Sequence, residues 1–247
     1  MSSVAMPLHT GHGHAQSVLH STCPVSWHAV ARRRVYFGHQ SVGRDIIAGL
    51  EALNAEHGLG LRFAQTRTPS LLAGPAFVDF LAGENTRPVT KNRALLEQLD
   101  ARELPDDAIV MLKYCYVDIA EGTDVRRLLH DYRQTVELIH RRHPDVTVVH
   151  VTVPLTSNES VMKWRLKKVL GRPTLRGANA RRNEYNALLR ATLAGREPLF
   201  DLAAVEGDGV LEGSFTHDGG HLNAAGARAA AAALLDVLGA IATSDAA

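Results

Sequence analysis

Two continuous apolar runs constrain the fold of this chain more than any other feature. Residues 108–116 contain Ala-Ile-Val-Met-Leu in unbroken succession, and residues 146–153 form a second run that ends at Pro154. The first run shows no alternation of apolar with polar residues, and the second is mostly apolar, whereas a strand with one exposed face would alternate regularly. Unbroken apolar strands are typical of parallel sheets that helices cover on both faces. The sequence therefore predicts an α/β fold.

Segments with helical periodicity alternate with these runs and with shorter apolar stretches. Helices are predicted over residues 43–56, 89–99, 124–142, 179–193 and 224–241, and further strands over 35–37, 59–66 and 199–202. Strands that alternate with helices imply a parallel sheet between two helical layers. We therefore expect a three-layer α/β/α sandwich with a mainly parallel central sheet. Residues 67–93 and 157–177 lack regular periodicity, and we expect irregular structure in both.

The length of the chain suits a single domain of this kind. Its 247 residues can bury a substantial core, and no linker or repeat divides them. Residues 1–31 are rich in Gly, Ser, Pro and His, so we predict a disordered tail there and one folded domain over 32–242. The Gly-His-Gly-His run within the tail could bind a metal weakly instead. The tail shows no basic start followed by an apolar core, which predicts a cytoplasmic protein without a secretory signal.

A turn that could take part in catalysis lies between the first predicted strand and the first predicted helix. Val35-Tyr36-Phe37 has strand composition, Gly38 permits a tight turn, and Ser41 directly precedes the helical pattern. A serine at such a junction projects from a rigid element. The free N–H groups at the start of the helix can stabilise an anion beside it. The alternative interpretation is that Ser41 only caps the helix.

A second candidate pair lies just before the last predicted helix. Asp218 and His221 are three residues apart in the sequence Thr-His-Asp-Gly-Gly-His-Leu-Asn-Ala-Ala-Gly. A histidine that acts as a base needs an acceptor on one ring nitrogen, so that the other can take a proton from a hydroxyl. One loop could supply both the base and the acceptor. The alternative is a helix-capping aspartate beside a surface histidine.

Together these two stretches resemble the SGNH (GDSL-like) hydrolase family. Gly-His-Gln-Ser, ending at Ser41, stands where many members have Gly-Asp-Ser, and the stretch from Asp218 to residue 226 matches closely the block before the last helix. The resemblance extends over about residues 34–240. It implies an SGNH/flavodoxin-like fold and a serine esterase that needs no metal or cofactor. Ser41 would be the nucleophile, His221 the general base, and Asp218 the residue that orients it.

The resemblance also implies donors for the oxyanion. In the family, a glycine N–H and an asparagine side chain assist the N–H of the nucleophile. The loop around residues 81–88 contains Gly83 and Asn85, and we expect the Gly83 N–H and the Asn85 amide to serve. The alternative is that Gly-Glu-Asn is an ordinary turn.

One block of the chain departs from the family pattern. The usual Gly-x-Asn-Asp after a central strand is replaced at residues 113–118 by Lys-Tyr-Cys-Tyr-Val-Asp, so the expected asparagine is missing. One donor must then come from elsewhere, and Lys113 or a backbone N–H near Cys115 could serve. Cys115 could also be the nucleophile itself, since a thiolate is more reactive than a hydroxyl. A cysteine that ends an apolar strand is more commonly a small buried residue.

Two further features keep alternatives open. His39 lies two residues before Ser41 and could be the base, although its position indicates a role in lining the site or stabilising the turn. Residues 163–182 carry eight lysines and arginines. This basic segment could meet an anionic glycan, a phosphorylated substrate or a membrane surface, or simply be a solvated loop. Trp164 and Leu166 within it could cap the site as a lid.

Composition excludes several classes of function. The formal charge of +1 gives no general attraction for nucleic acid, and two cysteines cannot form a disulfide framework. The sequence contains no run of 18 apolar residues, so it predicts no membrane span. We expect a serine esterase acting on a small-molecule or glycan ester, and the resemblance suggests a short acyl group on a carbohydrate. An O-acyltransferase with the same residues and a non-catalytic glycan-binding protein are the alternatives; the oligomeric state is open.

Overall fold

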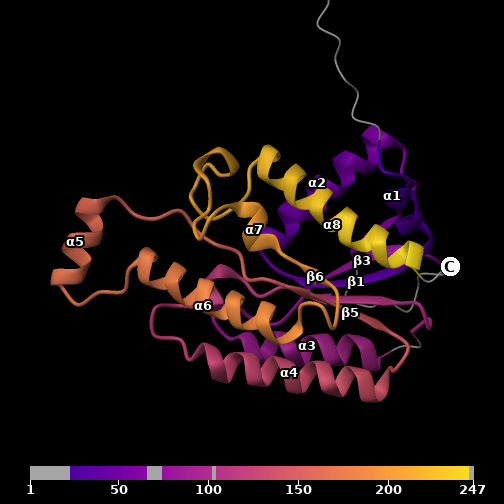
Figure 1. Cartoon of the computed structure of the whole chain (residues 1–247), viewed down its shortest axis with the longest axis horizontal. Helices are drawn as coiled ribbons and strands as arrows, with labels where there is room; N and C mark the ends of the chain where they lie inside the picture. Colours follow the sequence, from indigo (N-terminus) through magenta and orange to yellow (C-terminus); the bar gives the residue numbers. More distant parts are fainter. Residues whose placement is uncertain (1–22, 66–73, 102–103, 245–247) are drawn as a thin grey trace, which may run out of the picture.

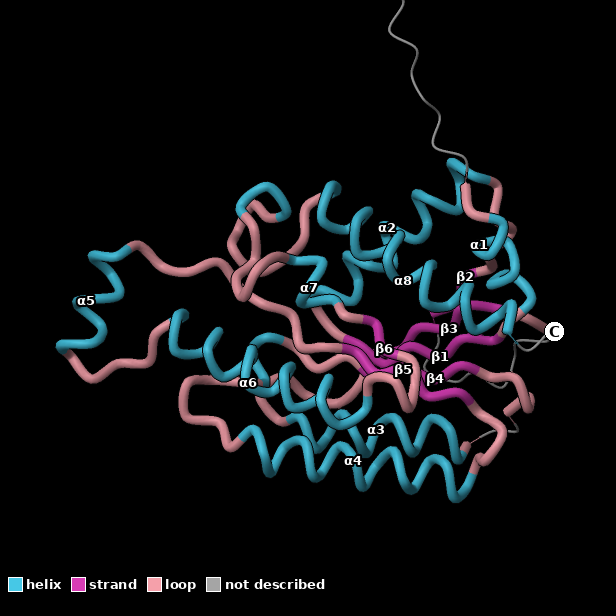
Figure 2. Tube along the Cα trace, in the orientation of Figure 1, coloured by secondary structure: helices cyan, strands magenta, loops and turns pink. Residues whose placement is uncertain are grey.

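The computed structural model describes residues 23–65, 74–101 and 104–244. Within them, six parallel strands form one sheet in the order β2-β3-β1-β4-β5-β6 (Figures 1 and 2). The strands are β1 (Arg34–His39), β2 (Phe63–Gln65), β3 (Ala76–Leu81), β4 (Ile109–Leu112), β5 (Thr147–Val151) and β6 (Leu199–Phe200). The α-helices are α1 (Val25–Ala29), α2 (Val42–His57), α3 (Pro88–Asp100), α4 (Val125–Arg142), α5 (Val161–Val169), α6 (Leu175–Leu193), α7 (Leu202–Glu206) and α8 (Ala224–Ser244). Short 3₁₀ turns are η1 (Val30–Arg32), η3 (Tyr116–Asp118) and η4 (Gly213–Phe215).

Helices cover both faces of the sheet. Figure 1 shows α1, α2, α7 and α8 on one face and α3, α4 and α6 on the other. Along β1, Val35 and Phe37 belong to the core under the first group, while Tyr36 belongs to the core under the second. Alternate residues of one strand are thus buried on opposite faces, which explains why the strands are apolar without alternation. The predicted three-layer α/β/α sandwich is confirmed.

The central strand β1 is the point where the strand order reverses. It lies between β3 and β4, so the chain builds one half of the sheet before it crosses to the other. In open α/β sheets, ligands bind beyond the carboxyl ends of the strands at such a point. Ser41 follows β1 by two residues, and the topology therefore places it where a site is expected.

Two elements lie in segments where the sequence predicted irregular structure. Strand β3 falls inside 67–93; its sequence, Ala-Phe-Val-Asp-Phe-Leu, is a short apolar run whose signal is masked by nearby glycine and proline. Five of its six residues are buried because it pairs with β1 and β2. Helix α5 falls inside 157–177 and buries no residue, so it leaves no core-facing periodicity. The strand predicted over 59–66 is shorter, at residues 63–65.

The N-terminal boundary of the domain also differs from the prediction. Helix α1, within the segment predicted as a disordered tail, packs against α8. The Trp27 ring is buried there, and its N–H donates to Asp236 at 2.7 Å. The folded part therefore begins before residue 32. His9, His12 and His14 lie outside the described residues.

Among the described helices, only α8 is long and apolar enough to cross a membrane, judged by length and composition alone. Half of its most apolar stretch is buried inside the protein. Leu234, Leu235 and Leu238 are fully buried in the core beneath it. Gly49 of α2 lies so close that a Cβ there would stand 2.2 Å from the Ala227 carbonyl oxygen. In this fold α8 is a core helix packed closely on α2.

Candidate active site

Ser41 occupies a strained turn between β1 and α2. Its φ of 53° and ψ of −117° lie in a region that residues with a side chain rarely adopt. Such strain costs about 1–3 kcal/mol and persists only where the surrounding structure enforces it. The Ser41 side chain makes no capping hydrogen bond to α2. The geometry thus differs from that of an ordinary N-cap and turns the hydroxyl toward another partner.

That partner is His221, at the far end of the sequence. Ser41 Oγ lies 2.7 Å from His221 Nε2, and His221 Nδ1 lies 2.6 Å from Asp218 Oδ2. A carboxylate that accepts the Nδ1 proton fixes the neutral tautomer in which Nε2 is free to accept. The Ser41 hydroxyl can then donate to Nε2. The structure brings the three residues predicted as a triad into one continuous hydrogen-bonded chain.

Asp218 is held ionised by the loop that contains it. Its Oδ1 accepts the backbone N–H groups of His221 and Gly220, each at 2.8 Å. The His221 backbone and ring, followed by the Gly220 N–H, hold the pKa of the Asp218 carboxyl well below its usual range. These donors come from the turn itself, which explains the short Asp-Gly-Gly-His spacing. A carboxylate that remains charged is suited to stabilise a neighbouring imidazolium.

Asp45 fastens this loop to the helix that follows the serine. It lies in the first turn of α2, and its Oδ2 accepts the N–H of Leu222, the residue after His221, at 3.0 Å. Burial raises the pKa of the Asp45 carboxyl. The contact fixes His221 relative to Ser41 across the core. Sequence reasoning missed Asp45; an acidic residue in the first helical turn was its only signal, and such residues commonly serve the helix dipole.

Tyr116 forms a wall beside the histidine. Its ring centre lies 6.1 Å from that of His221 in an edge-on arrangement. The Arg182 guanidinium lies 5.7 Å from the centre of the Tyr116 ring and donates to the Tyr116 carbonyl at 2.9 Å. A Cβ on Gly220 would stand 2.9 Å from the Tyr116 hydroxyl. The ring therefore restricts the motion of the loop that holds His221.

The predicted oxyanion loop lies beside Ser41. The Gln40 side-chain amide donates to the Ala82 carbonyl at 3.0 Å and also to the Gly83 carbonyl. The His39 carbonyl accepts the Ala82 N–H at 3.0 Å. These bonds hold residues 82–83 against the serine turn. Within the described parts of the chain, no acceptor takes the N–H of Ser41 or of Gly83.

Asn85 is oriented by a buried ion pair. Lys91 Nζ donates to Asn85 Oδ1 at 3.1 Å and to Asp118 Oδ2 at 2.6 Å. The side chains of Lys91 and Asp118 are completely buried. Asp118 Oδ1 accepts the N–H of Thr86 at 2.8 Å, at a backbone with a φ of 67°. Because Lys91 occupies its oxygen, the Asn85 amide keeps its NH₂ group available, and no described residue accepts from it.

Lys113 and Cys115 lie beneath the site rather than in it. Both are fully buried, and Lys113 Nζ lies 3.6 Å from Cys115 Sγ. Burial lowers the pKa of the Lys113 ammonium. The Cys115 N–H donates to Asp118 at 2.6 Å and is therefore occupied. The expectation that Lys113 or Cys115 contacts the substrate does not fit these positions; the 3₁₀ turn η3 presents Tyr116 to the site instead.

His39 is also behind the site. It is 1% exposed, and its Nε2 lies 3.0 Å from Asp79 Oδ2. Burial lowers the pKa of its ring. A Cβ on Gly43 would stand 2.4 Å from the ring, so the imidazole fills the space under the start of α2. This position fits the turn-stabilising interpretation and leaves His221 as the histidine in contact with Ser41.

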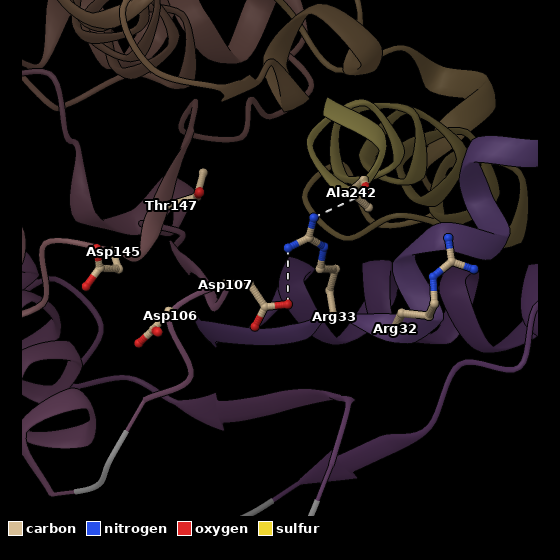
Figure 3. A pocket seen from close by; sticks show the side chains of 7 residues that line it. All are labelled: Arg32, Arg33, Asp106, Asp107, Asp145, Thr147 and Ala242. Atoms are coloured by element: carbon tan, nitrogen blue, oxygen red, sulfur yellow. Dashed lines mark hydrogen bonds and ion pairs between the residues drawn. The ribbon is translucent and has the colours of Figure 1, made fainter. Parts of the chain in front are cut away.

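A separate cavity of about 650 Å³ lies far from this chemistry. It is lined by Arg32, Arg33, Asp106, Asp107, Asp145, Thr147 and Ala242 (Figure 3). All of them except Ala242, which lies near the end of α8, precede or begin β1, β4 or β5, so the cavity opens at the amino ends of these strands. Arg33 spans it, donating to Asp107 at 3.1 Å and to the Ala242 carbonyl at 3.3 Å. Across the residues described, no group of three or more His, Cys, Asp or Glu side chains is placed to hold a metal ion.

Comparison with known proteins agrees with the geometry. Residues 46–229 match the GDSL-like Lipase/Acylhydrolase family. The matched region includes Asp218 and His221 and begins just after Ser41. A comparison with curated proteins finds no match.

Several solved structures share the fold. A protein from Streptococcus pneumonia, assigned as a platelet activating factor, is 19% identical with a TM-score of 0.52, over 86% of this chain and 89% of that one. One from Desulfitobacterium hafniense, assigned as a lipolytic protein of the G-D-S-L family, is 11% identical with a TM-score of 0.53, over 83% and 99%. One from Bacteroides fragilis, assigned as an acylhydrolase, is 15% identical with a TM-score of 0.50, over 87% and 88%. At these levels of sequence identity, the similarity shows a shared fold and nothing more.

The family match extends over most of the folded chain, and the sheet order, the serine turn and the histidine loop all accord with it. The chain therefore belongs to the GDSL-like lipase/acylhydrolase family and is an SGNH-type hydrolase.

Proposed function

We propose that this protein is a serine esterase that cleaves an acyl ester through an acyl-enzyme on Ser41. The observation that carries the proposal is the hydrogen-bonded chain from Ser41 Oγ to His221 Nε2, at 2.7 Å, and from His221 Nδ1 to Asp218, at 2.6 Å. A hydroxyl becomes a useful nucleophile when an adjacent base accepts its proton. The strained backbone of Ser41 supports the same role, because strain is commonly kept at functional sites.

The reaction follows from these contacts. Ser41 Oγ attacks the ester carbonyl carbon while its proton passes to His221 Nε2. The tetrahedral intermediate collapses, the bond to the alcohol breaks, and His221 returns the proton to the leaving oxygen. Water then attacks the acyl-enzyme, again giving its proton to His221, which passes it to Ser41 as the acid leaves. Asp218 remains ionised throughout and stabilises the imidazolium.

Three donors around Ser41 would bind the oxyanion. The N–H groups of Ser41 and Gly83 have no acceptor among the described residues, and neither has the NH₂ group of Asn85, whose oxygen accepts from Lys91. Preorganised donors of this kind act where charge develops, and each can contribute about 3 kcal/mol. Asn85 would take the place of the asparagine that is missing from residues 113–118. Its orientation by a buried lysine favours this assignment.

For the substrate, we infer a short acyl group on a carbohydrate. The side chains of His221 and Asp218 are 46% and 57% exposed, so the base lies at an open edge of the molecule. Such a site can accept an ester whose alcohol part remains in water, as a sugar does. The same exposure gives water access to the acyl-enzyme, which favours hydrolysis over transfer to another alcohol.

Hydrolysis of p-nitrophenyl acetate by the wild type and by Ser41→Ala tests the proposal. We expect turnover by the wild type and its loss in the variant. Acetylated and deacetylated sugars are then compared as substrate and as acceptor. Acetate release that does not depend on an acceptor sugar indicates an esterase, whereas product formation that requires the acceptor indicates an acyltransferase. A wild type that turns over neither ester would support the non-catalytic glycan-binding alternative.

A further inference from the structure

Helix α5 stands out from the body of the protein (Figures 1 and 2). None of its residues is buried. Met162, Leu166 and Val169 are 83%, 61% and 84% exposed, although each is a large apolar side chain. Large apolar side chains grouped on one exposed element mark an interaction surface more often than scattered ones do.

The two ends of this projection are firmly fixed. The Glu159 carboxylate, before α5, accepts the N–H groups of Leu175 and Arg176 at 2.9 and 3.1 Å. Glu121 accepts the N–H of Thr174 at 2.8 Å. Residues 160–174, which we call the arm, therefore leave and rejoin the domain at defined points. The arm is held away from the domain rather than folded back on it.

One side of the arm is an apolar stripe. Met162, Leu166 and Val169 follow the i, i+4, i+7 spacing that places residues on one face of a helix, and the 55%-exposed Leu170 extends the same face. Trp164 lies on the other side, where the Arg176 guanidinium stands 5.4 Å from its ring centre. The stripe thus faces solvent while the indole is turned toward the foot of α6.

The flanks of the stripe are strongly basic. The arm carries Lys163, Arg165, Lys167, Lys168 and Arg172 and no acidic residue. Lys167 lies 3.5 Å from Glu159. For the other four, no carboxylate in the described parts of the chain lies within ion-pair distance. Lys163 and Lys167 stand four residues apart on the helix, where like charges repel.

An isolated helix of this kind has little to stabilise it. Helices shorter than about 12 residues are marginal in water without tertiary packing, and α5 has nine residues and buries none of them. The repulsion between Lys163 and Lys167 adds to the cost. An anionic surface with an apolar interior would relieve both, because it would cover the stripe and neutralise the flanks.

We propose that the arm docks onto the surface of an anionic lipid bilayer. Helix α5 would lie in the plane of the interface, with Met162, Leu166 and Val169 among the acyl chains. Lys163 and Arg165 would extend to the headgroups, since long basic side chains keep their charge in the polar layer. Amphipathic helices bind membranes by this combination of apolar insertion and attraction to anionic lipid.

The size and charge of the arm favour a bilayer over a protein partner. A nine-residue helix is about 14 Å long and 10 Å wide. The area that one side of such a helix can cover is far smaller than the roughly 800 Å² that each side of a stable protein interface buries. A second copy of this chain would bring an equally basic arm against the first. A bilayer needs no shape complementarity and supplies the opposite charge.

Docking would also orient the site. The loop before the arm is hydrogen-bonded to the loop that contains His221: the Ser157 N–H donates to the Gly219 carbonyl at 2.8 Å. The arm and Ser41 therefore share the edge of the sheet at which the strands end. Membrane binding would bring this edge toward the lipid surface, whichever ester the enzyme cleaves; the proposal does not depend on the esterase activity.

The test is co-sedimentation of the full chain with phosphatidylcholine vesicles and with vesicles that also contain phosphatidylglycerol. We expect binding only to the anionic vesicles. Two double variants of the arm should each bind at least about tenfold more weakly. The first combines Met162→Ser and Val169→Ser, and the second combines Lys163→Glu and Arg165→Glu. The control Arg126→Glu with Arg141→Glu makes the same charge change on exposed residues of α4 and should bind as the wild type does.

Two further readouts keep the outcome unambiguous. Circular dichroism establishes that each variant is folded, and light scattering reports the oligomeric state. The proposal is overturned if the wild type does not bind anionic vesicles, or if both arm variants bind them as well as the wild type does. It is equally overturned if the arm variants convert a dimer into a monomer while vesicle binding stays unchanged, since the stripe would then be a contact between two copies.

Discussion

The hydroxyl of Ser41 lies 2.7 Å from Nε2 of His221, although 180 residues separate the two in the sequence. The sheet creates this contact, because Ser41 follows the central strand and His221 precedes the helix that packs on α2. Asp45 fixes the distance by binding the backbone at Leu222. A nucleophile and its base are thus held together by the core itself.

The strained backbone at Ser41 predicts an unusual order of stabilities. Glycine adopts positive φ without penalty, whereas alanine keeps the strain. Ser41→Gly should therefore be about 1 kcal/mol more stable than Ser41→Ala, with both inactive. At Ala48, an exposed position within α2, Ala48→Gly should instead destabilise by about 1 kcal/mol. Urea unfolding measures all three, and equal stability of the two Ser41 variants would contradict the strain argument.

Asp218→Asn should reduce kcat by about 10⁴-fold, because an amide can donate to the histidine and favour the wrong tautomer. KM should change little, since Asp218 does not contact the substrate in this mechanism. The matched control is Asp208→Asn, an exposed acid in the neighbouring loop, which should retain wild-type kcat. Steady-state kinetics on a soluble ester measures both; a loss of less than tenfold in Asp218→Asn would show that the carboxylate does not set the tautomer.

Asn85→Ala should lower kcat by about 10²-fold with little change in KM, because the amide is proposed to bind the oxyanion only as charge develops. The neighbouring substitution Glu84→Gln changes the same loop at an exposed surface ion pair with Arg87 and should have no such effect. If Asn85→Ala raised KM at constant kcat, the amide would bind the ground state of the substrate instead.

Glu206 gives a pH dependence to stability. Burial raises the pKa of this carboxyl to about 8, from an ordinary value of 4.5. Between these values the folded state holds a proton that the unfolded chain has lost, so stability should fall as the pH rises through this window. The slope should be at most about 1.4 kcal/mol per pH unit.

The variant Glu206→Gln isolates this effect. It keeps an acceptor for the Leu155 N–H, which donates to Glu206 at 2.6 Å, but cannot ionise. Its free energy of unfolding should therefore vary less with pH than that of the wild type, and its advantage should grow from about pH 5 to about pH 8. Parallel pH profiles for the two proteins, measured by urea unfolding, would rule out a titrating Glu206.

Much of the fold could be predicted because its signals are local. The unbroken apolar strands and the long amphipathic helices carry their own periodicity, and Asp218 and His221 belong to one short turn. Strand β3 was missed because six residues between glycines and prolines look like a loop until their neighbours are known. Helix α1 was missed for a related reason, since its assignment depends on the contact between Trp27 and Asp236.

The parts of the site that the sequence did not predict depend on contacts between distant segments. Asp45 reaches Leu222 across the core, and Lys91 orients Asn85 through a buried pair with Asp118. None of these residues forms a motif, because their roles depend on three-dimensional position alone. Lys113 and Cys115 illustrate the opposite case, because they are near a site block in the sequence and yet both side chains are fully buried.

The most direct test of the account is the mass of the protein after reaction with a fluorophosphonate, followed by mapping of the labelled residue. An activated serine attacks phosphorus and displaces fluoride, leaving a stable adduct. We expect one adduct, on Ser41, that is absent in Ser41→Ala and strongly slowed in His221→Ala. Labelling at another residue, or labelling of Ser41 that proceeds equally well without His221, would contradict the central claim that these two side chains form the catalytic pair.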